Sequence, residues 1–190
     1  MILPLIKFKS VGELRSMFGW DNNLNYPENI RILEEKFLIY TLKQEGFEFD
    51  FTIAKEEKGK PYFKYNDKVH FSVTDSKDYI AVAVCDKRIG IDIEYLRKDK
   101  MHIAERYFHP NETAYLHNVT KEFSDAAFTQ LWTIKEAYVK MTGTGIAGNF
   151  ITKDLTPESF DYNQDFYRYN SHIVSYFDTA TEFFVSICTK

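Results

Sequence analysis

The sequence predicts an α+β fold, because segments with helical and strand patterns are grouped along the chain instead of alternating one by one. In the first half a helical segment precedes strand patterns, and in the second half helical segments again precede strand patterns. This repeated order predicts two related lobes, over residues 1–95 and 96–190. With 190 residues, 44% of them hydrophobic, the chain can bury a sizeable core.

The first predicted helix covers residues 27–47. Apolar side chains recur on one face at helical spacing, with Pro27 at the beginning and Gly46 near the end. These apolar positions are Ile30, Leu33, Phe37 and Tyr40.

Three strand patterns follow this helix. They cover residues 69–74, 79–85 and 88–95. The last two are separated by Asp86 and Lys87, which predicts a tight hairpin between them.

The second half begins with two short predicted helices, residues 101–108 and 110–119, and Pro110 suits the first position of the second one. The strongest helical pattern then covers Ser124–Thr142. Its predicted core positions are Phe128, Leu131, Ile134, Tyr138 and Met141.

The ends of this strong helix also carry signals. Ser124 or Asp125 is expected to cap its beginning, and Gly143 is expected to end it. Further along, residues 172–177 and 182–188 predict another hairpin.

Composition excludes some classes of function. The net charge of −4 argues against a generic binder of nucleic acid or of an anionic membrane, so an anionic ligand must be held by local basic clusters. The apolar run at the N-terminus is interrupted by Pro4, Lys7 and Lys9 and is too short for a signal segment or a membrane span. A cytoplasmic location is therefore expected.

The chain has two cysteines, Cys85 and Cys188, each inside an apolar strand pattern. We expect two buried thiols in a reducing compartment, with a disulfide as the alternative.

The strand at 88–95 carries the first chemical signal. Strand side chains alternate between faces, so Gly90, Asp92 and Glu94 share the face opposite three isoleucines. Two carboxylates this close repel each other unless a cation lies between them, and a divalent ion with oxygen ligands is a suitable partner. The alternative is an amphipathic strand with a solvated acidic face.

The strong helix carries the second signal. Trp132, Glu136 and Lys140 recur every four residues and form one row, with Lys135 beside it. If this helix packs against the acidic strand, Glu136 supplies a third carboxylate. Three oxygen ligands would leave positions for water and a substrate phosphate, which is the usual magnesium pattern. Ordinary surface pairing along the helix is the alternative.

Several runs of sequence, in this order, resemble the 4′-phosphopantetheinyl transferases of the Sfp type. They are "GKPYF" (59–63), "FSVTDSKDY" (71–79), "IGIDIEY" (89–95), "YFHPNETAYL" (107–116) and "LWTIKEAYVKMTGTGI" (131–146). The resemblance implies two similar α+β lobes related by a pseudo-twofold axis, with the active site in the cleft between them. It also implies transfer of the phosphopantetheine arm of coenzyme A to a serine of an apo acyl or peptidyl carrier protein, with release of adenosine 3′,5′-bisphosphate.

The resemblance assigns roles to particular residues. Asp92, Glu94 and Glu136 match the family's magnesium-binding acids. Lys140 matches a lysine near the transferred phosphate, and Glu136, or a water that it orients, is the expected base.

Other matches concern coenzyme A. Lys60 and Pro61 match a loop that touches coenzyme A, and by a looser match Arg31 corresponds to an arginine that binds its 3′-phosphate. For Lys135 a phosphate contact and a structural salt bridge are both open.

The sequence departs from the family at Ser72, where Asn is usual, and at Asp75, where a His near a coenzyme A phosphate is usual. An acid would repel that phosphate by about 4 kcal/mol at roughly 4 Å and an effective dielectric near 20, and by about 1 kcal/mol in water. Asp75 could face solvent and leave the phosphate to the Thr74 and Ser76 hydroxyls. The other possibilities are that Lys77 replaces the donor or that coenzyme A binding is weakened.

Carrier proteins are generally acidic and this chain has a net charge of −4, so carrier recognition is expected to use a local basic or apolar patch. Arg97, Lys98, Lys100 and Arg106 are candidates, with a solvated charged loop as the alternative. A monomer is expected, because two lobes in one chain would complete the cleft. Two other functions remain open: a relative that binds coenzyme A or the carrier without turnover, and another magnesium-dependent enzyme that cleaves a pyrophosphate.

Overall fold

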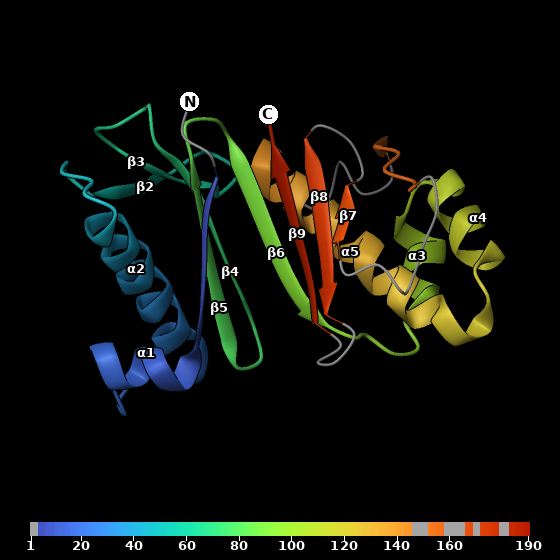
Figure 1. The fold of residues 1–190 in the computed structure, drawn as a ribbon, viewed down its shortest axis with the longest axis horizontal. Helices are drawn as coiled ribbons and strands as arrows, with labels where there is room; N and C mark the ends of the chain where they lie inside the picture. The colour runs from blue at the N-terminus through green and yellow to red at the C-terminus, as the bar shows by residue number, and fades with distance from the viewer. Residues whose placement is uncertain (1–3, 146–151, 158–165, 169–171, 179–182) are drawn as a thin grey trace.

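A computed structural model describes residues 4–145, 152–157, 166–168, 172–178 and 183–190. Helices and sheets occupy both halves of the described chain, as predicted for an α+β fold (Figure 1). Within the described ranges, no helix is long and apolar enough to cross a membrane.

The first half contains a three-stranded antiparallel sheet with strand order β1-β5-β4, a separate β2-β3 hairpin and two helices. Their bounds are β1 Leu5–Ser10, α1 Val11–Phe18, α2 Tyr26–Gln44, β2 Ile53–Lys55, β3 Pro61–Phe63, β4 His70–Ser76 and β5 Tyr79–Cys85. The sequence prediction included α2, β4 and β5 but not β1, α1, β2 or β3.

The helices of the first half pack against one face of β5. Ile80, Val82 and Val84 share a buried cluster with Leu33 and Phe37 of α2. Helix α2 begins at a capping box. The Asn25 side chain accepts a hydrogen bond from the Glu28 amide, and the Glu28 side chain accepts one from the Asn25 amide.

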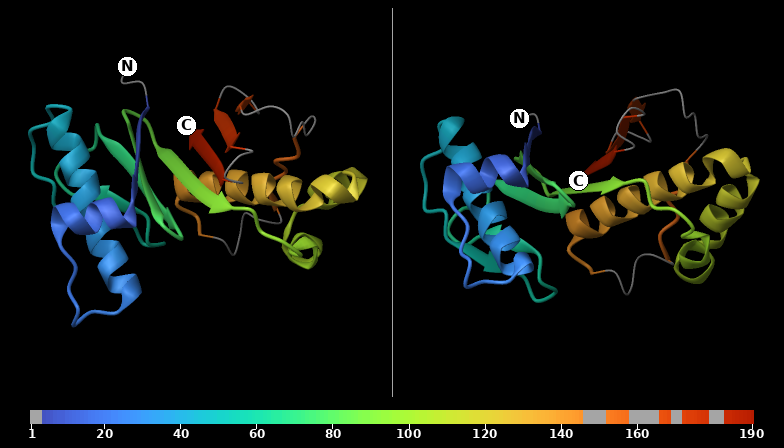
Figure 2. Two further views of the ribbon diagram at one scale, coloured as in Figure 1. Left: turned by 60° about the horizontal axis from the view of Figure 1, so that its bottom comes forward. Right: turned by 90° about the horizontal axis from the view of Figure 1, so that it is seen from below.

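A four-stranded sheet in the order β6-β9-β8-β7 combines β6, the last strand of the first half, with strands of the second half, which also has three helices. The bounds are β6 Ile89–Tyr95, α3 Met101–Tyr107, α4 Pro110–Asn118, α5 Ser124–Thr142, β7 Phe166–Arg168, β8 Ile173–Asp178 and β9 Phe183–Thr189. The long helix α5 runs along the back of this sheet in Figure 1, and α3 and α4 lie at its far end (Figure 2). The predicted β8-β9 hairpin is confirmed.

The predicted hairpin between β5 and β6 is wrong. One edge of β5 pairs with β1 and the other with β4, so β5 has no edge left for β6. Instead β6 pairs antiparallel with β9. The division into lobes at residue 95 remains a prediction, although β6, which it assigned to the first lobe, forms its ladder in the second sheet.

A shared apolar cluster joins the two sheets. Ala81 and Ala83, on the second face of β5, contact a row of three buried isoleucines on β6. The small alanines allow close approach, and the row Ile89, Ile91 and Ile93 is the one that the sequence predicted to face inward.

The prediction for α5 is confirmed in its bounds and at its end, where Gly143 adopts a left-handed conformation with φ of 71°. The predicted cap at its beginning is wrong. A 3-10 turn, Lys121–Phe123, leads directly into the helix, so Phe123 occupies the cap position and its side chain provides no capping hydrogen bond. Ser124 donates to the Lys121 carbonyl, and Asp125 accepts from the Asp99 amide.

Cys85 and Cys188 form no disulfide with each other, and both are buried, as expected. Burial raises the pKa of the Cys188 thiol to about 12. Part of the glycine-rich run that the resemblance placed after α5 lies outside the described residues.

Candidate active site

The helix α5 packs directly on the acidic strand β6, and Gly90 makes this approach possible. A Cβ atom at Gly90 would overlap the carbonyl oxygen of Ala137 and lie 2.5 Å from the amide nitrogen of Met141. The sequence interpretation required α5 to pack against the acidic strand β6, and this contact meets that condition. It brings Glu136 and the acids of β6 into one region.

Asp92 forms an ion pair with the lysine of the helical row. The Lys140 ammonium donates to Asp92 Oδ1 at 2.7 Å and to the Thr74 hydroxyl at 2.9 Å. Thr74 itself donates to Asp92 Oδ1 at 3.1 Å, while the buried Asp92 Oδ2 has no hydrogen-bond partner among the described residues. Burial raises the pKa of Asp92, and the Lys140 ammonium opposes that shift.

Glu94 has two partners of its own. Its carboxylate accepts from the Ser76 hydroxyl at 3.0 Å and from the Arg97 guanidinium at 2.9 Å. The same guanidinium lies 4.4 Å from the ring centroid of Trp132 on α5. Burial raises the pKa of Glu94, and Arg97 counteracts this effect.

Glu136 projects from α5 at the wall of a cavity. Burial raises the pKa of Glu136 to about 7, with further contributions from the Asp92 and Glu94 charges, while Lys140 lowers it. A carboxyl group that titrates near neutrality is suited to accept a proton at physiological pH.

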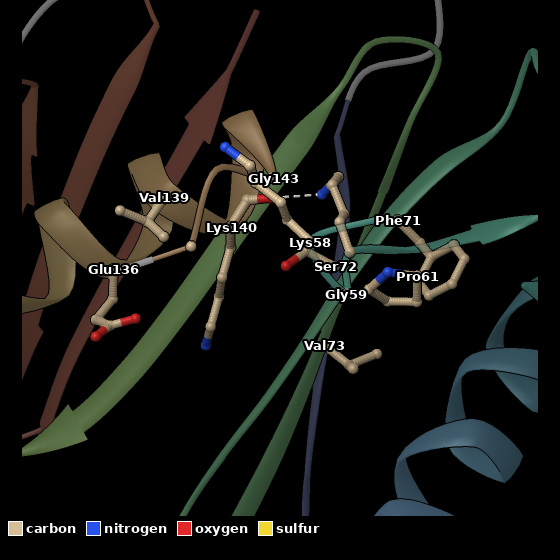
Figure 3. A pocket seen from close by; sticks show the side chains of 12 residues that line it. Lys58, Gly59, Pro61, Phe71, Ser72, Val73, Glu136, Val139, Lys140 and Gly143 are labelled. Atoms are coloured by element: carbon tan, nitrogen blue, oxygen red, sulfur yellow. Dashed lines mark hydrogen bonds between the residues drawn. The ribbon is translucent and has the colours of Figure 1, made fainter. Parts of the chain in front are cut away.

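The cavity has a volume of about 290 Å³ and is lined by residues from both halves of the chain. Figure 3 shows Glu136 and Lys140 of α5 on one side, with Pro61, Phe71 and Val73 opposite them. Lys60 also lines the cavity, but its ammonium donates to backbone carbonyls. A mostly apolar wall with a few polar groups is typical of a small-molecule site.

The donor chemistry of the three acids fits a magnesium ion. All three supply oxygen, one buried oxygen of Asp92 is unpartnered, and the charges on the β6 acids raise the pKa of Glu136. As they are placed, however, the described side chains include no group of three acids, histidines or cysteines positioned to hold one metal ion. Because Lys140 occupies one oxygen of Asp92, binding would require these side chains to rearrange.

The residues around Asp75 lie on alternate faces of β4. Asp75 is exposed, while Thr74 and Ser76 are buried and donate to the two acids of β6. The Lys77 ammonium lies 4.2 Å from the centroid of the Tyr95 ring. The predicted contacts of Thr74, Asp75 and Ser76 with coenzyme A therefore remain predictions. In this structure the Thr74 and Ser76 hydroxyls donate hydrogen bonds to Asp92 and Glu94.

Sequence reasoning missed Glu34, one turn beyond Arg31 on α2. Burial raises the pKa of Glu34 to about 7, with a further contribution from Asp75, while Lys140 and Arg31 lower it. These influences show that α2 directs an acid toward the site. The only sequence signal was the spacing of three from Arg31, which faces solvent.

Lys135 does not share the surroundings of Lys140. Its ammonium is buried and donates to both oxygens of Glu112 on α4, at 2.8 and 2.7 Å, and to the Lys153 carbonyl at 3.1 Å. Glu112 also accepts from the Leu155 amide at 2.7 Å. These contacts correspond to the salt-bridge alternative, and they give no support to a phosphate contact.

The basic segment after β6 divides into two groups. Arg97 is half-buried and engaged with Glu94 and Trp132, so it belongs to the site. Lys98 and Arg106 are exposed.

Residues 88–184 match the family model described as the 4′-phosphopantetheinyl transferase superfamily. The chain is 34% identical over 115 residues to the 4′-phosphopantetheinyl transferase gsp of Aneurinibacillus migulanus. The aligned segment covers 60% of this chain and 47% of that protein. It is 37% identical over 109 residues to the 4′-phosphopantetheinyl transferase psf-1 of Bacillus pumilus, covering 57% and 45% of the two chains.

A third relative is the 4′-phosphopantetheinyl transferase HetI of Nostoc, with 38% identity over 98 residues, 48% of this chain and 41% of that protein. The chain spans about half the length of the curated relatives that it matches. The matched segment begins at Arg88 and contains β6 and α5, the elements that bring the acids together. On this match, the chain belongs to the 4′-phosphopantetheinyl transferase superfamily.

Proposed function

We propose that the protein transfers the 4′-phosphopantetheine arm of coenzyme A to a serine of an apo acyl or peptidyl carrier protein, with magnesium as cofactor. The observation that carries this proposal is the packing of α5 on β6, which brings Glu136 and Lys140 to the acidic strand beside a cavity. The printed activity of the relatives supports the same reaction.

The cavity is the proposed site for coenzyme A. The loop that carries Lys60 and Pro61 lines the cavity and would contact the nucleotide through its backbone and Pro61. Arg31 on α2, which is exposed, would meet the 3′-phosphate. A diphosphate is strongly anionic, so the Lys140 ammonium would exchange its Asp92 contact for a phosphate oxygen. Magnesium held by the acids of the site would offset the charge of the diphosphate.

Glu136 is the proposed general base. It would accept the proton of the carrier serine hydroxyl, directly or through a water, as the serine oxygen forms a bond to the β-phosphorus. The bond between this phosphorus and the bridging oxygen breaks, and adenosine 3′,5′-bisphosphate leaves with that oxygen. The pKa of Glu136, raised to about 7 chiefly by burial, supports this role.

The carrier would dock beside the entrance to the site. Lys98, Lys100 and Arg106 are the proposed contacts for an acidic carrier, since Arg97 is already engaged with Glu94. We further propose a monomer of two similar lobes, with the site in the cleft between them. Two buried cysteines that form no disulfide with each other suit a cytoplasmic location.

Mass spectrometry of the carrier tests the proposal. The protein is mixed with coenzyme A, magnesium and an apo carrier, and the carrier is expected to gain the mass of one phosphopantetheine arm. Glu136→Gln keeps the size of the side chain but removes the base, so it should slow transfer by about 100-fold or more. An unmodified carrier in the wild-type reaction would refute the proposal, and cleavage of coenzyme A without carrier modification would indicate a pyrophosphate-cleaving enzyme.

A second function, binding without turnover, is favoured by the acidic pair of Glu34 and Asp75. Each of these acids opposes an anionic ligand, and the negative charge of Asp75 contributes to the raised pKa of Glu34. If Asp75 faces a coenzyme A phosphate, Asp75→His will tighten coenzyme A binding in titration calorimetry. Unchanged or weaker binding would place Asp75 away from the phosphates.

A further inference from the structure

The carboxyl end of α5 is held by a side chain from the first half of the protein. The last carbonyl groups of a helix have no partner within the helix. The Lys60 ammonium donates to the carbonyl oxygen of Lys140 at 2.5 Å and to that of Ile89 at 3.0 Å. One amine from the loop before β3 thus joins the last turn of α5 to the first residue of β6.

Arg88 holds the next two carbonyls of the helix. Its guanidinium donates to Met141 at 3.2 Å and to Thr142 at 3.1 Å. Glu56 receives two further bonds from the same guanidinium, both at 2.9 Å, in a bidentate ion pair. The Glu56 amide also donates to the Lys60 carbonyl at 2.8 Å, so Lys60 and Glu56 are parts of one tight turn.

These groups are packed closely at Gly143. A Cβ atom at Gly143 would lie 2.8 Å from Arg88 Nη2, 2.9 Å from Glu56 Oε2 and 3.1 Å from Lys60 Cδ. Gly143 has a positive φ, and this left-handed conformation ends helix α5. Cations at the carboxyl end of a helix are favoured by its dipole, which gives this arrangement an electrostatic reason.

We propose that Lys60, together with the Arg88–Glu56 pair, is a positioning residue that fixes the last turn of α5 against β6. Lys140 is the link to chemistry, because its carbonyl accepts from Lys60 while its ammonium contacts Asp92. The effect on turnover rests on the proposed function, whereas the effect on the helix does not. This role differs from a direct contact between the Lys60 ammonium and a coenzyme A phosphate.

Burial of Lys60 is consistent with this role. Burial and the nearby Arg88 lower its pKa to about 8, and Glu56 opposes the shift. The amine is a hydrogen-bond donor in either protonation state, so the contacts to the two carbonyls persist on both sides of that pH.

Amide hydrogen exchange of the free protein tests the positioning role directly. In Lys60→Met the aliphatic stem remains but the donors are lost, so amides in the last turn of α5 should exchange about tenfold faster or more. Lys55→Met, an exposed lysine on β2, is the matched control and should leave exchange in α5 unchanged. Far-UV circular dichroism confirms that each variant is folded.

Steady-state kinetics of carrier modification provide the second test. Arg88 is not among the described residues that line the cavity, so Arg88→Met affects the site through the helix and through its pair with Glu56. Lys60→Met and Arg88→Met should each lower kcat by about 10- to 100-fold, with changes in KM for coenzyme A within about threefold. Lys60→Arg keeps the donors and should recover most of kcat.

A ligand contact gives a different pattern. If Lys60→Met raises KM for coenzyme A while α5 exchanges normally in the free protein, the positioning role is overturned. Normal exchange in both Lys60→Met and Arg88→Met overturns it as well. An inactive wild-type protein would refute the proposed function instead, and the exchange comparison would still decide the role of Lys60.

Discussion

The ion pair between Lys140 and Asp92 allows a quantitative prediction. We consider Lys140→Met, which keeps the stem of the side chain and removes its charge. The two charged atoms are 2.7 Å apart, and the side chains are 30% and 8% exposed. At this distance and an effective dielectric near 20 the gross attraction is about 6 kcal/mol, but desolvation of both ions offsets a large part of it.

We therefore expect Lys140→Met to lower the free energy of unfolding by about 2–3 kcal/mol. In a protein of this size, that corresponds to a fall in Tm of roughly 4–12 °C. Thermal unfolding in the presence of a chelator measures the effect. The exposed Lys55→Met variant should change Tm by less than about 2 °C.

A double-mutant cycle with Asp92→Asn isolates the pair. Because each single change leaves one partner buried without its counter-charge, the double variant should be more stable than the sum of the single effects by about 2 kcal/mol. Additive effects would show that the pair contributes no stability and would refute the reasoning.

Magnesium adds a further expectation to this experiment. Loss of Lys140 leaves Asp92 without its ion-pair partner, so added magnesium should raise the Tm of Lys140→Met more than that of the wild type. Equal shifts in the two proteins would mean that Lys140 does not compete with the ion for Asp92.

Three other predictions concern packing, a buried ion pair and pH. Gly90→Ala should lower the free energy of unfolding by about 1–3 kcal/mol in urea titrations, because the new Cβ would overlap the backbone of α5. Gly12→Ala on α1, where a Cβ meets nothing within 4 Å, is the control and should be neutral or slightly stabilising. Lys135→Met should cost about 3–5 kcal/mol, because Lys135 and Glu112 are 1% and 0% exposed, and the double variant with Glu112→Gln should recover part of the loss; equal Tm values for the single and double variants would contradict this. For Glu34, a folded-state pKa raised from 4.5 to about 7 means that stability falls as pH rises through that window, by at most about 3 kcal/mol. Glu34→Gln should flatten this dependence in denaturant titrations at several pH values, and an unchanged pH profile would show that Glu34 is not buried against a like charge.

Features that depend on neighbours along the chain were predicted well from the sequence. The bounds of α5 follow from apolar residues at helical spacing and from Gly143, and the two faces of β6 follow from strand alternation. The meeting of Glu136 with the acids of β6 needed more than periodicity. Its basis was the resemblance, since nothing local specifies which strand a helix covers.

Features that depend on distant parts of the chain were not predicted. The strand pattern alone does not specify that β4 pairs with β5 or that β9 pairs with β6. These pairings depend on which strand edges are still open in the folded protein. The direction of the Lys60 amine is also a tertiary property, because its acceptors belong to β6 and α5. Likewise, the sequence placed the Thr74 hydroxyl near a ligand, while in the structure it donates to Asp92.

The pairing of β6 with β9 has a consequence for how the protein is made. Tyr95 pairs with Phe183, so the strand that carries the acids emerges from the ribosome long before its ladder partner. Until then its open edge must be shielded by transient contacts or by a chaperone. We expect nascent chains that lack β9 to be protease-sensitive over β6, even though the first sheet is already complete.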